Sequence, residues 1–320
     1  TFFGSKVWEV SDDLQFSGIL SWDSYDFVET RLNATRSYFP SREEELYFRL
    51  LGQWAPDDYN AMALGFEQSR EVFGLSTRLS DQPTRGQRLG FIDEPWTVYT
   101  PSVFGEYRSE LSDPLTVILA ARLDKHTYSD YLFSPRVSVL LEMTEIDLLK
   151  FNIGQSTRKA GDEELRAQWI VPGNVYPDNE TIQYMEIRWE ETPRDNLLLA
   201  TSFFYHLHDV IGFTGSTSQS TLLGTFESWG YEVEAEYVNG STFYTISHSY
   251  TKLISGELVN PSLIQGISAA PYGFGNDFGN WSPNLTKFAI AQDLDCRTNV
   301  STSLRVYWGF PGARDLARYN

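Results

Sequence analysis

The sequence predicts an all-β protein whose strands form an antiparallel transmembrane β-barrel. Three observations support this prediction. Apolar and polar residues alternate with a period of two through much of the chain, which gives each strand one apolar and one polar face. Short turns alternate with long connections from strand to strand. Aromatic residues make up 15% of the sequence, a high content that is typical of barrels with aromatic girdles.

The clearest element is a hairpin around Asn239-Gly240, within WGYEVEAEYVNGSTFYTISHSYTKL at residues 229–253. Asn-Gly between two alternating runs is a strong signal for a type I′ turn. A register centred on this dipeptide places Val233 opposite Ile246. One face is then aromatic and aliphatic, whereas the other carries glutamates at 232, 234 and 236 together with serine and threonine. A soluble sandwich would bury the first face, and a membrane barrel would turn it toward lipid.

The same period marks the other predicted strands. They include residues 46–54, 115–124, 136–143, 184–190, 197–207, 287–295 and 300–310. No sustained helical period is found, and we expect about fourteen strands in all.

The connections between these strands favour the membrane barrel. Short turns are predicted at residues 11–13, 55–58, 112–114, 144–147, 191–196, 239–240 and 295–299, and longer connections at 24–44, 68–100, 125–134, 157–180, 209–228 and 254–284. Outer-membrane barrels keep short turns on the periplasmic side and long loops outside the cell, whereas a soluble sandwich has no reason to do so. Because a charge at mid-bilayer costs on the order of 2–4 kcal/mol, the three glutamates must face a hydrated lumen or a plug domain.

Composition excludes several other classes of protein. The formal net charge of -18 argues against nucleic acid as a partner, since nucleic acid is bound through Lys and Arg. The single cysteine, Cys296, excludes a disulfide within the chain and a zinc ribbon. No apolar run is long enough for a transmembrane helix. The chain opens TFFGSKVW, without Met or a basic, apolar leader, so we expect any signal peptide to be removed or to lie outside this segment.

No catalytic constellation is found, so we predict neither an enzyme nor a cofactor. His206 and His208 share one strand face, but without a third ligand they do not predict a metal site. The carboxylates at 57–58 and 43–45 fall at turns or strand starts, where solvation explains them. The run PYGFGNDFGNW at 271–281 suggests a calcium or ligand site, but we interpret it as an outer loop.

Four segments contain strand and loop motifs that follow one another in a characteristic order and spacing. They are LTVILAARLDKHTYSDYLFSPRVSVLLE (115–142), KFNIGQSTRKA (150–160), WGYEVEAEYVNGSTFYTISHSYTKLISGEL (229–258) and NWSPNLTKFAIA (280–291). The first contains an Arg-x-Asp strand end at Arg122 and Asp124 and a Ser-Pro-Arg strand start at Ser134. Over residues 98–310 the combination resembles the β-barrel of TonB-dependent outer-membrane receptors. Residues 1–97 fit that family only in architecture.

The resemblance also sets expectations about the extent of the barrel. It implies about twenty-two strands, an N-terminal plug domain and a short segment that contacts TonB. Residues 1–320 are expected to form a β-barrel domain that lacks the plug, so we expect the chain to be an internal portion of a larger receptor. A closed fourteen-stranded barrel would instead indicate a porin-like channel.

The function implied by the resemblance is uptake of a scarce nutrient across the outer membrane of a Gram-negative bacterium. The ligand would be a metal chelate, vitamin or oligosaccharide, and the other partners would be the lipid bilayer and the TonB complex, reached through a plug. A passive porin-like channel, a soluble carbohydrate-binding β protein and an all-β hydrolase remain alternatives. In the family, outer loops and the plug apex hold the ligand, so the candidate contacts are the loop aromatics Trp169, Tyr176, Tyr272, Phe274 and Trp281.

Overall fold

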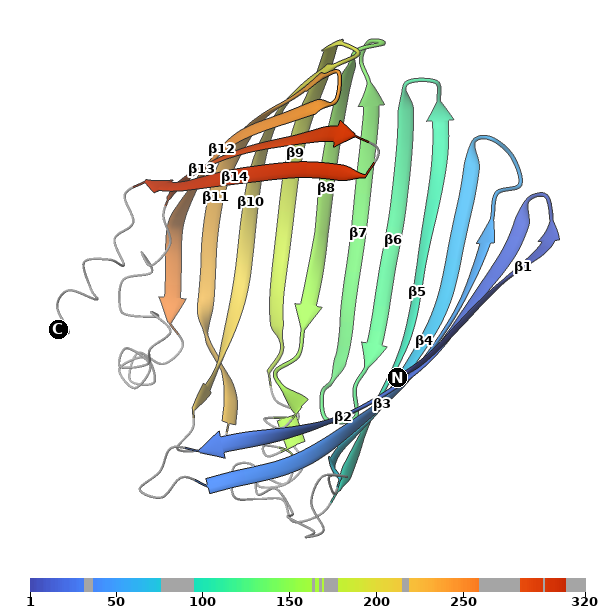
Figure 1. The fold of residues 1–320 in the computed structure, drawn as a ribbon, viewed down its shortest axis with the longest axis vertical. Coiled ribbons are helices and arrows are strands. Elements are labelled where there is room, and N and C mark those ends of the chain that lie inside the picture. The colour runs from blue at the N-terminus through green and yellow to red at the C-terminus, as the bar shows by residue number, and fades with distance from the viewer. Residues whose placement is uncertain are drawn as a thin grey trace.

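The computed structural model describes residues 1–31, 37–75, 95–162, 165, 166, 169, 178–214, 219–258, 283–295 and 297–308. The strands of these residues form one antiparallel sheet in which each strand bonds to its neighbours in the sequence (Figure 1). They are β1 (Phe2–Ser11), β2 (Leu14–Arg31), β3 (Ser37–Trp54), β4 (Asn60–Leu75), β5 (Trp96–Ser112), β6 (Leu115–Lys125), β7 (Tyr131–Glu142), β8 (Asp147–Arg158), β9 (Glu180–Arg194), β10 (Leu197–Thr214), β11 (Gln219–Asn239), β12 (Thr242–Leu258), β13 (Asn284–Asp295) and β14 (Thr298–Trp308). The predicted all-β antiparallel architecture is confirmed.

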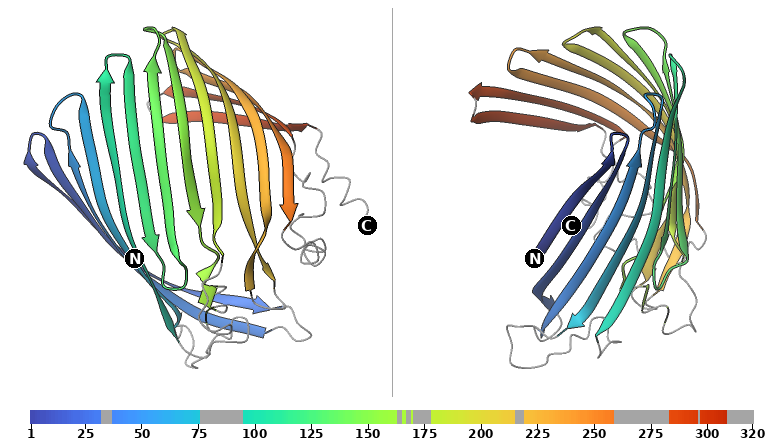
Figure 2. Two further views of the ribbon diagram at one scale, coloured as in Figure 1. Left: turned by 180° about the vertical axis from the view of Figure 1, so that it is seen from behind. Right: turned by 90° about the vertical axis from the view of Figure 1, so that its right-hand side faces the viewer.

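The sheet is a single curved layer with two edges (Figure 2). Among the described strands, β1 bonds only to β2 and β14 only to β13. The pairing of β1 with β14 that a closed fourteen-stranded barrel requires is therefore not seen between them, and the total of about twenty-two strands stays a prediction. In the same residues, no helix is long and apolar enough to cross a membrane.

Tight turns and longer connections alternate along the chain, as the sequence predicts. The tight turns gather at the upper end of the sheet in Figure 1 and the longer connections at the lower end. Each longer connection is shorter than predicted, most clearly residues 32–36 in place of 24–44 and residues 215–218 in place of 209–228. These two predictions were wrong because the apolar alternation ends before the strands do. Paired strands keep their backbone hydrogen bonds in water, and so do not need an apolar face there.

The β11–β12 hairpin has a different register from the predicted one. Asn239 pairs with Thr242, and Val233 pairs with His248 instead of Ile246. The turn is therefore centred on Gly240 and Ser241, and Gly240 adopts the left-handed conformation with φ of 60°. The predicted register was wrong by two residues. Because side chains alternate between faces with a period of two, this error leaves every side chain on its predicted face.

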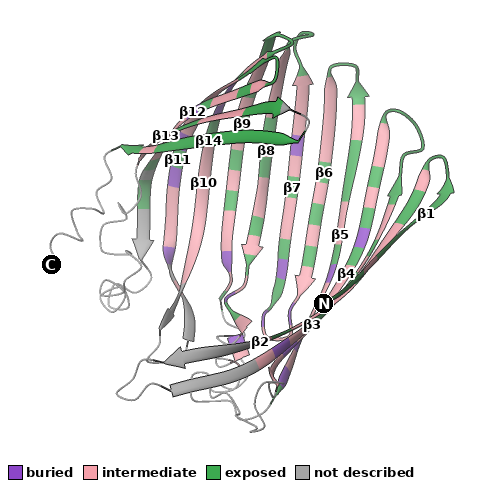
Figure 3. Cartoon of the chain, in the orientation of Figure 1, coloured by how far each residue is buried: buried purple, intermediate pink, exposed green. Residues whose placement is uncertain are grey.

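The apolar face is the more exposed side of the sheet. Exposed and partly buried residues alternate along most strands (Figure 3), and the exposed set includes Leu119 at 47% and Val233 at 41%. On β11 this face runs from Trp229 to Tyr237, about the nine to eleven residues that a tilted strand needs to cross a bilayer. Aromatic pairs close both ends of that run, with ring centroids 5.8 Å apart for Trp229 and Tyr250 and 6.1 Å apart for Tyr237 and Tyr244.

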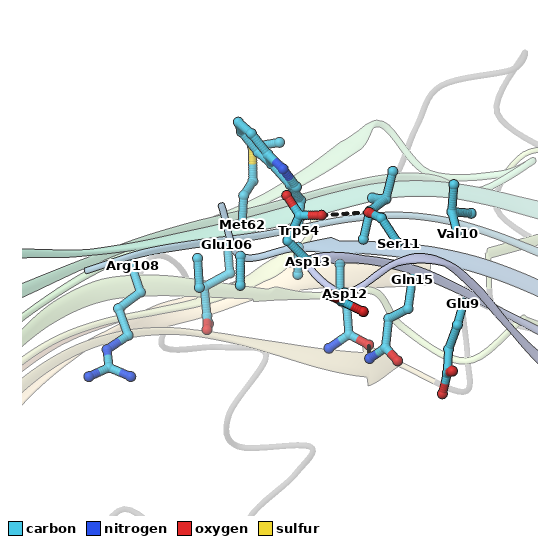
Figure 4. Close-up of a pocket in the computed structure, with 15 residues that line it drawn as sticks. Glu9, Val10, Ser11, Asp12, Asp13, Gln15, Trp54, Met62, Glu106 and Arg108 are labelled. Atoms are coloured by element: carbon cyan, nitrogen blue, oxygen red, sulfur yellow. Dashed lines mark hydrogen bonds between the residues drawn. The ribbon is translucent and has the colours of Figure 1, made fainter. Parts of the chain in front are cut away.

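The opposite face is polar, and we call it the inner wall. It carries the glutamates of β11 and most of the ion pairs that link neighbouring strands, and its side chains are mostly half-buried. Side chains on the concave side of a curved sheet converge and cover one another, which explains their lower exposure. Near the tight-turn ends of β1–β5, Trp54 and Met62 point to one side of the sheet and Glu9, Gln15, Glu106 and Arg108 to the other (Figure 4).

The two faces predict unequal tolerance of charge. Replacing Val233 or Leu119 with Arg should strongly reduce assembly into the outer membrane, because each substitution puts a charge into hydrocarbon at a cost of about 2–4 kcal/mol. Thr245→Arg and Thr116→Arg on the inner wall are the matched controls. Assembly is measured as the fraction of protein that shows heat-modifiable mobility in isolated outer membranes. Equal tolerance at all four positions would contradict the assignment of the faces.

Candidate functional site

The inner wall of β3–β6 is held together by an ion-pair network centred on Arg122. The Arg122 guanidinium donates to Asp124 at 2.9 Å and to the Ser102 hydroxyl at 3.0 Å, and it lies 2.7 Å from a carboxylate oxygen of Glu67. Glu67 is also 3.6 Å from Arg49 on β3. Four successive strands are therefore connected by side chains that would be too costly to place against lipid.

A second network crosses the inner wall of β8–β11. Glu190 lies 2.7 Å from Lys150 on β8 and 2.7 Å from Arg188, and Arg188 reaches Glu234 on β11 at 3.0 Å. The Arg188–Glu234 contact passes over β10, where Ala200 and Ser202 are small and buried. Small side chains on β10 leave the space for this contact.

The glutamates of β11 are not equivalent. Glu234 belongs to the second network, whereas Glu232 and Glu236 form no ion pair among the residues that the structure describes. All three lie on the inner wall, as the sequence predicts for a hydrated lumen or a plug-facing surface. Two of the three inward glutamates of β11 therefore take part in no ion pair with the described residues.

Inward aromatic rings lie over glycines of the neighbouring strand. A Cβ atom on Gly65 would stand 2.1 Å from the Phe104 ring, so only glycine leaves room for the ring. The Phe104 ring is held in place by the guanidinium groups of Arg49 and Arg122, which lie 5.2 Å and 5.5 Å from its centroid. Two further inward rings lie over glycines in the same way: Tyr184 over Gly154 and Phe204 over Gly230.

An open hollow of about 830 Å³ lies near the tight-turn end of β1–β5 (Figure 4). Small residues, Ala61 and Ala63, contribute to its lining beside the polar Gln15, Glu106 and Arg108. Two of its charged side chains are in ion pairs, since Glu106 lies 2.9 Å from Arg136 and Arg108 contacts Glu110. The hollow is a polar surface that a second polypeptide layer can pack against.

At the opposite end, a short helical segment of the β8–β9 connection lies on the inner wall. Residues 162, 165, 166 and 169 are helical, and the Leu165 amide donates to the Gly161 carbonyl at 2.9 Å. We call the described residues 159–162, 165, 166 and 169 the strap. The largest fully buried side chains of the described chain are Leu165 of the strap and His126, Val98 and Ser129 of the wall beneath it.

The polar contact between strap and wall joins Asp162 to His126. The His126 Nδ1 atom accepts a hydrogen bond from the Tyr128 amide at 3.1 Å, and His126 Nε2 lies 2.7 Å from a carboxylate oxygen of Asp162. Burial alone would raise the pKa of the Asp162 carboxyl, but hydrogen bonds from His126 and Lys159 and the positive charge of Lys159 hold it below its usual range. Asp162 is therefore ionised at neutral pH.

Aromatic contacts extend the same junction. Phe73 stacks on Trp96 with centroids 4.3 Å apart, Trp96 lies 6.1 Å from Tyr128, and Tyr128 lies 6.3 Å from Trp169 of the strap. The Arg166 guanidinium stands 4.8 Å from the centre of the Trp96 ring, within the range of a cation–π contact.

Of the five predicted ligand contacts, one lies in the described residues, and all five stay predictions. Trp169 lies in the strap, against Tyr128. Tyr176, Tyr272, Phe274 and Trp281 lie outside the described residues. Sequence reasoning missed the helical strap, although the spacing of Asp162, Leu165, Arg166 and Trp169 follows a helical period. It also did not connect His126 with Asp162, because no local pattern links residues that far apart.

The two histidines of β10 have separate contacts. The His206 ring stacks on Phe204 with centroids 5.0 Å apart, and His208 Nε2 lies 2.6 Å from Glu180. Within the described ranges, no group of three or more His, Cys, Asp or Glu side chains could hold a metal ion.

Comparison with protein families decides what kind of barrel this is. The model of the family described as TonB dependent receptor-like, beta-barrel matches residues 1–262. The chain belongs to this family. The match begins at residue 1, so residues 1–97 resemble the family in sequence as well as in architecture. The prediction that they fit the family only in architecture was wrong. It ends before the segment at 280–291. No curated protein matches the sequence.

Solved structures with the same fold are receptors and transporters. The siderophore receptor PirA from Acinetobacter baumannii is 14% identical, with a TM-score of 0.62 over 92% of this chain and 47% of that one. A ferric enterobactin receptor variant from Pseudomonas aeruginosa is 12% identical, with a TM-score of 0.64 over 95% and 49%. The copper transporter OprC is 15% identical, with a TM-score of 0.60 over 93% and 50%.

These comparisons orient the molecule in its membrane. The chain spans about half the length of the structures that it matches, 47% to 50% in these three cases. The protein is located in the outer membrane of Gram-negative bacteria, as members of its family are. Its tight turns are therefore periplasmic, and the strap lies at the extracellular mouth.

The Phe104–Gly65 contact yields a prediction about stability. Gly65→Ala should destabilise the barrel by about 1–3 kcal/mol, because the added methyl group overlaps a ring that two arginines hold in place. The measurement is the temperature at which heat-modifiable mobility is lost. In a Phe104→Ala background the same substitution should cost much less, since the overlap is gone. An equal cost in both backgrounds would show that the ring does not explain the glycine.

Proposed function

We propose that this chain forms part of the wall of an outer-membrane receptor that takes up a scarce nutrient with energy supplied through TonB. The cargo class is a metal chelate, a vitamin or an oligosaccharide. The observation that carries the proposal is the inner wall, whose ion-pair networks across β3–β6 and β8–β11 face away from lipid and line a space that membership of the family associates with a plug.

The open edges of the sheet support a larger barrel. In hydrocarbon, each unpaired backbone amide or carbonyl costs several kcal/mol, so β1 and β14 need partners that the described strands do not give them. We propose that residues 1–320 are part of a barrel domain that further strands complete. The coverage of about half of the matched receptor structures agrees with this proposal.

The hollow and the strap suggest how the two ends of the wall are used. At the periplasmic end, the hollow beside Ala61, Ala63 and Glu106 suits a plug domain that packs on the wall. The plug domain would in turn contact TonB. At the extracellular end, we propose that Trp169 contacts the ligand from the strap, and that Tyr176, Tyr272, Phe274 and Trp281 contact it from outer loops. No enzymatic step is needed for this function.

Uptake by intact cells tests the proposal. Deletion of the gene should abolish uptake of one labelled probe among a ferric chelate, a cobalamin, a copper salt and a maltodextrin series, because the proposed receptor is the route by which that probe crosses the outer membrane. Inactivation of TonB in the parent strain should cause the same loss. Uptake that persists without TonB and rises linearly with probe concentration would indicate a passive channel, and unchanged uptake of all four probes would contradict nutrient import.

A further inference from the structure

On the described strands β4–β7, the apolar face carries only two charged side chains, and both are positive. Arg70 of β4 and Lys125 of β6 lie on this face near the extracellular ends of their strands, and every carboxylate of the four strands points to the inner wall. The chain as a whole has a formal net charge of -18. A positive pair without an adjacent carboxylate is therefore a local departure from the charge of the molecule.

Each of the two cations lies beside an exposed tyrosine. Arg70 is exposed and pairs across the sheet with Tyr99, and it forms no ion pair among the residues that the structure describes. Lys125 pairs with Tyr131, and its Nζ atom lies 5.1 Å from the centre of that ring and donates to the Ser129 carbonyl at 2.6 Å. Tyrosine is typical of the level at which a membrane protein meets lipid headgroups. We call Arg70, Tyr99, Lys125 and Tyr131 the basic rim.

An apolar surface continues from the basic rim toward the membrane centre. Its side chains are exposed and large, as lipid contact requires, and they come from successive strands of the sheet. They include Phe48 and Phe66, whose ring centroids lie 6.4 Å apart, and Leu123 and Phe133. The same face therefore offers hydrocarbon contacts in the bilayer and positive charge at the level of the headgroups, which is the combination that an anionic lipid needs.

The two cations are far enough apart to bind two phosphates. Arg70 pairs with Tyr99, and the Tyr99 carbonyl accepts a hydrogen bond at 3.1 Å from the amide of Thr127, two residues beyond Lys125. Lys125 thus lies across β5 from Arg70 and one side-chain step closer to the membrane centre. Two strand spacings and one two-residue step place the two backbones about 12 Å apart. A disaccharide with a phosphate at each end spans a comparable distance.

We propose that the basic rim binds a phosphorylated glycolipid of the outer leaflet. One phosphate lies at Arg70 and the other at Lys125, through charge-assisted hydrogen bonds, and the acyl chains cover the apolar surface of β3–β7. The outer leaflet supplies this lipid, because the extracellular ends of the strands stand among its phosphate-bearing headgroups. The proposal depends on the location of the protein in the outer membrane and not on the nutrient that it carries.

The other side of the sheet has the opposite charge at the same level. On the apolar face of β9–β11, near the extracellular ends of the strands, Asp209 accepts hydrogen bonds from the Thr181 and Thr225 hydroxyls at 2.7 Å each. A carboxylate there repels phosphate. The glycolipid should therefore occupy one defined site on β4–β7 and should not bind evenly along the rim of the barrel.

Native mass spectrometry of the purified full-length receptor tests this proposal. The probes are an acylated glucosamine disaccharide with two phosphates, the same glycolipid without phosphate, and phosphatidylcholine. The receptor should bind the first probe about tenfold or more tightly than the other two, because hydrogen bonds to charged groups contribute on the order of tenfold each. Combining Arg70→Gln with Lys125→Gln should remove most of that difference, and each substitution alone should remove part of it.

Controls separate this site from general attraction between charges. Lys287→Gln removes one exposed positive charge from the inner wall, and it should leave the affinity for the glycolipid unchanged. Heat-modifiable mobility checks that every variant is folded. Equal affinity for the glycolipids with and without phosphate, an equal loss in Lys287→Gln, or displacement of the lipid by inorganic phosphate alone would overturn the proposal. None of these measurements involves uptake, so they stand apart from the test of the proposed function.

Discussion

Backbone pairing between neighbouring strands is the constraint on which the rest of this structure depends. In a bilayer, every backbone amide and carbonyl needs a partner within the protein, and the single sheet supplies partners to all but its two edge strands. A one-layer wall has no interior of its own. Its apolar residues must therefore meet lipid, its charged residues must meet the lumen, and a large buried side chain is a sign that something else lies on the wall.

The same constraint explains how much the sequence predicts. Alternation and turn residues are local, so the strands, their faces and the position of the three β11 glutamates follow from them. Register depends on which turn residue adopts the left-handed conformation, and the choice of Gly240 with Ser241 over Asn239 with Gly240 shifted it by two residues. Apolar alternation does not predict how far β2, β3, β10 and β11 extend beyond the apolar band. Their backbones remain paired in water, where the side chains need not alternate. The His126–Asp162 contact joins two connections that are separated by two strands, and nothing local predicts it.

The inner wall has different chemistry at its two ends. At the periplasmic end it offers an open hollow lined by polar and charged side chains, among them Glu106, which is paired with Arg136. At the extracellular end, described residues of the β8–β9 connection lie against it, with Asp162 2.7 Å from His126 and Arg166 4.8 Å from the centre of the Trp96 ring. Between them, the network around Arg122 links four strands and the network around Arg188 links β8, β9 and β11. The chain belongs to the TonB-dependent receptor family, and under the proposed uptake function both ends of the wall would border the path of the nutrient.

The central claim is that β11 crosses the outer membrane with one face toward lipid and the other toward the lumen. Spin labels placed singly at residues 229–237 of the full-length receptor in lipid vesicles measure this directly, through collision with oxygen, which concentrates in hydrocarbon, and with a water-soluble nickel chelate. The account predicts a two-residue period, with oxygen contact greatest at odd positions such as Val233 and least at even positions such as Glu234. Uniform nickel contact along the strand, or oxygen contact greatest at the glutamates, would contradict it.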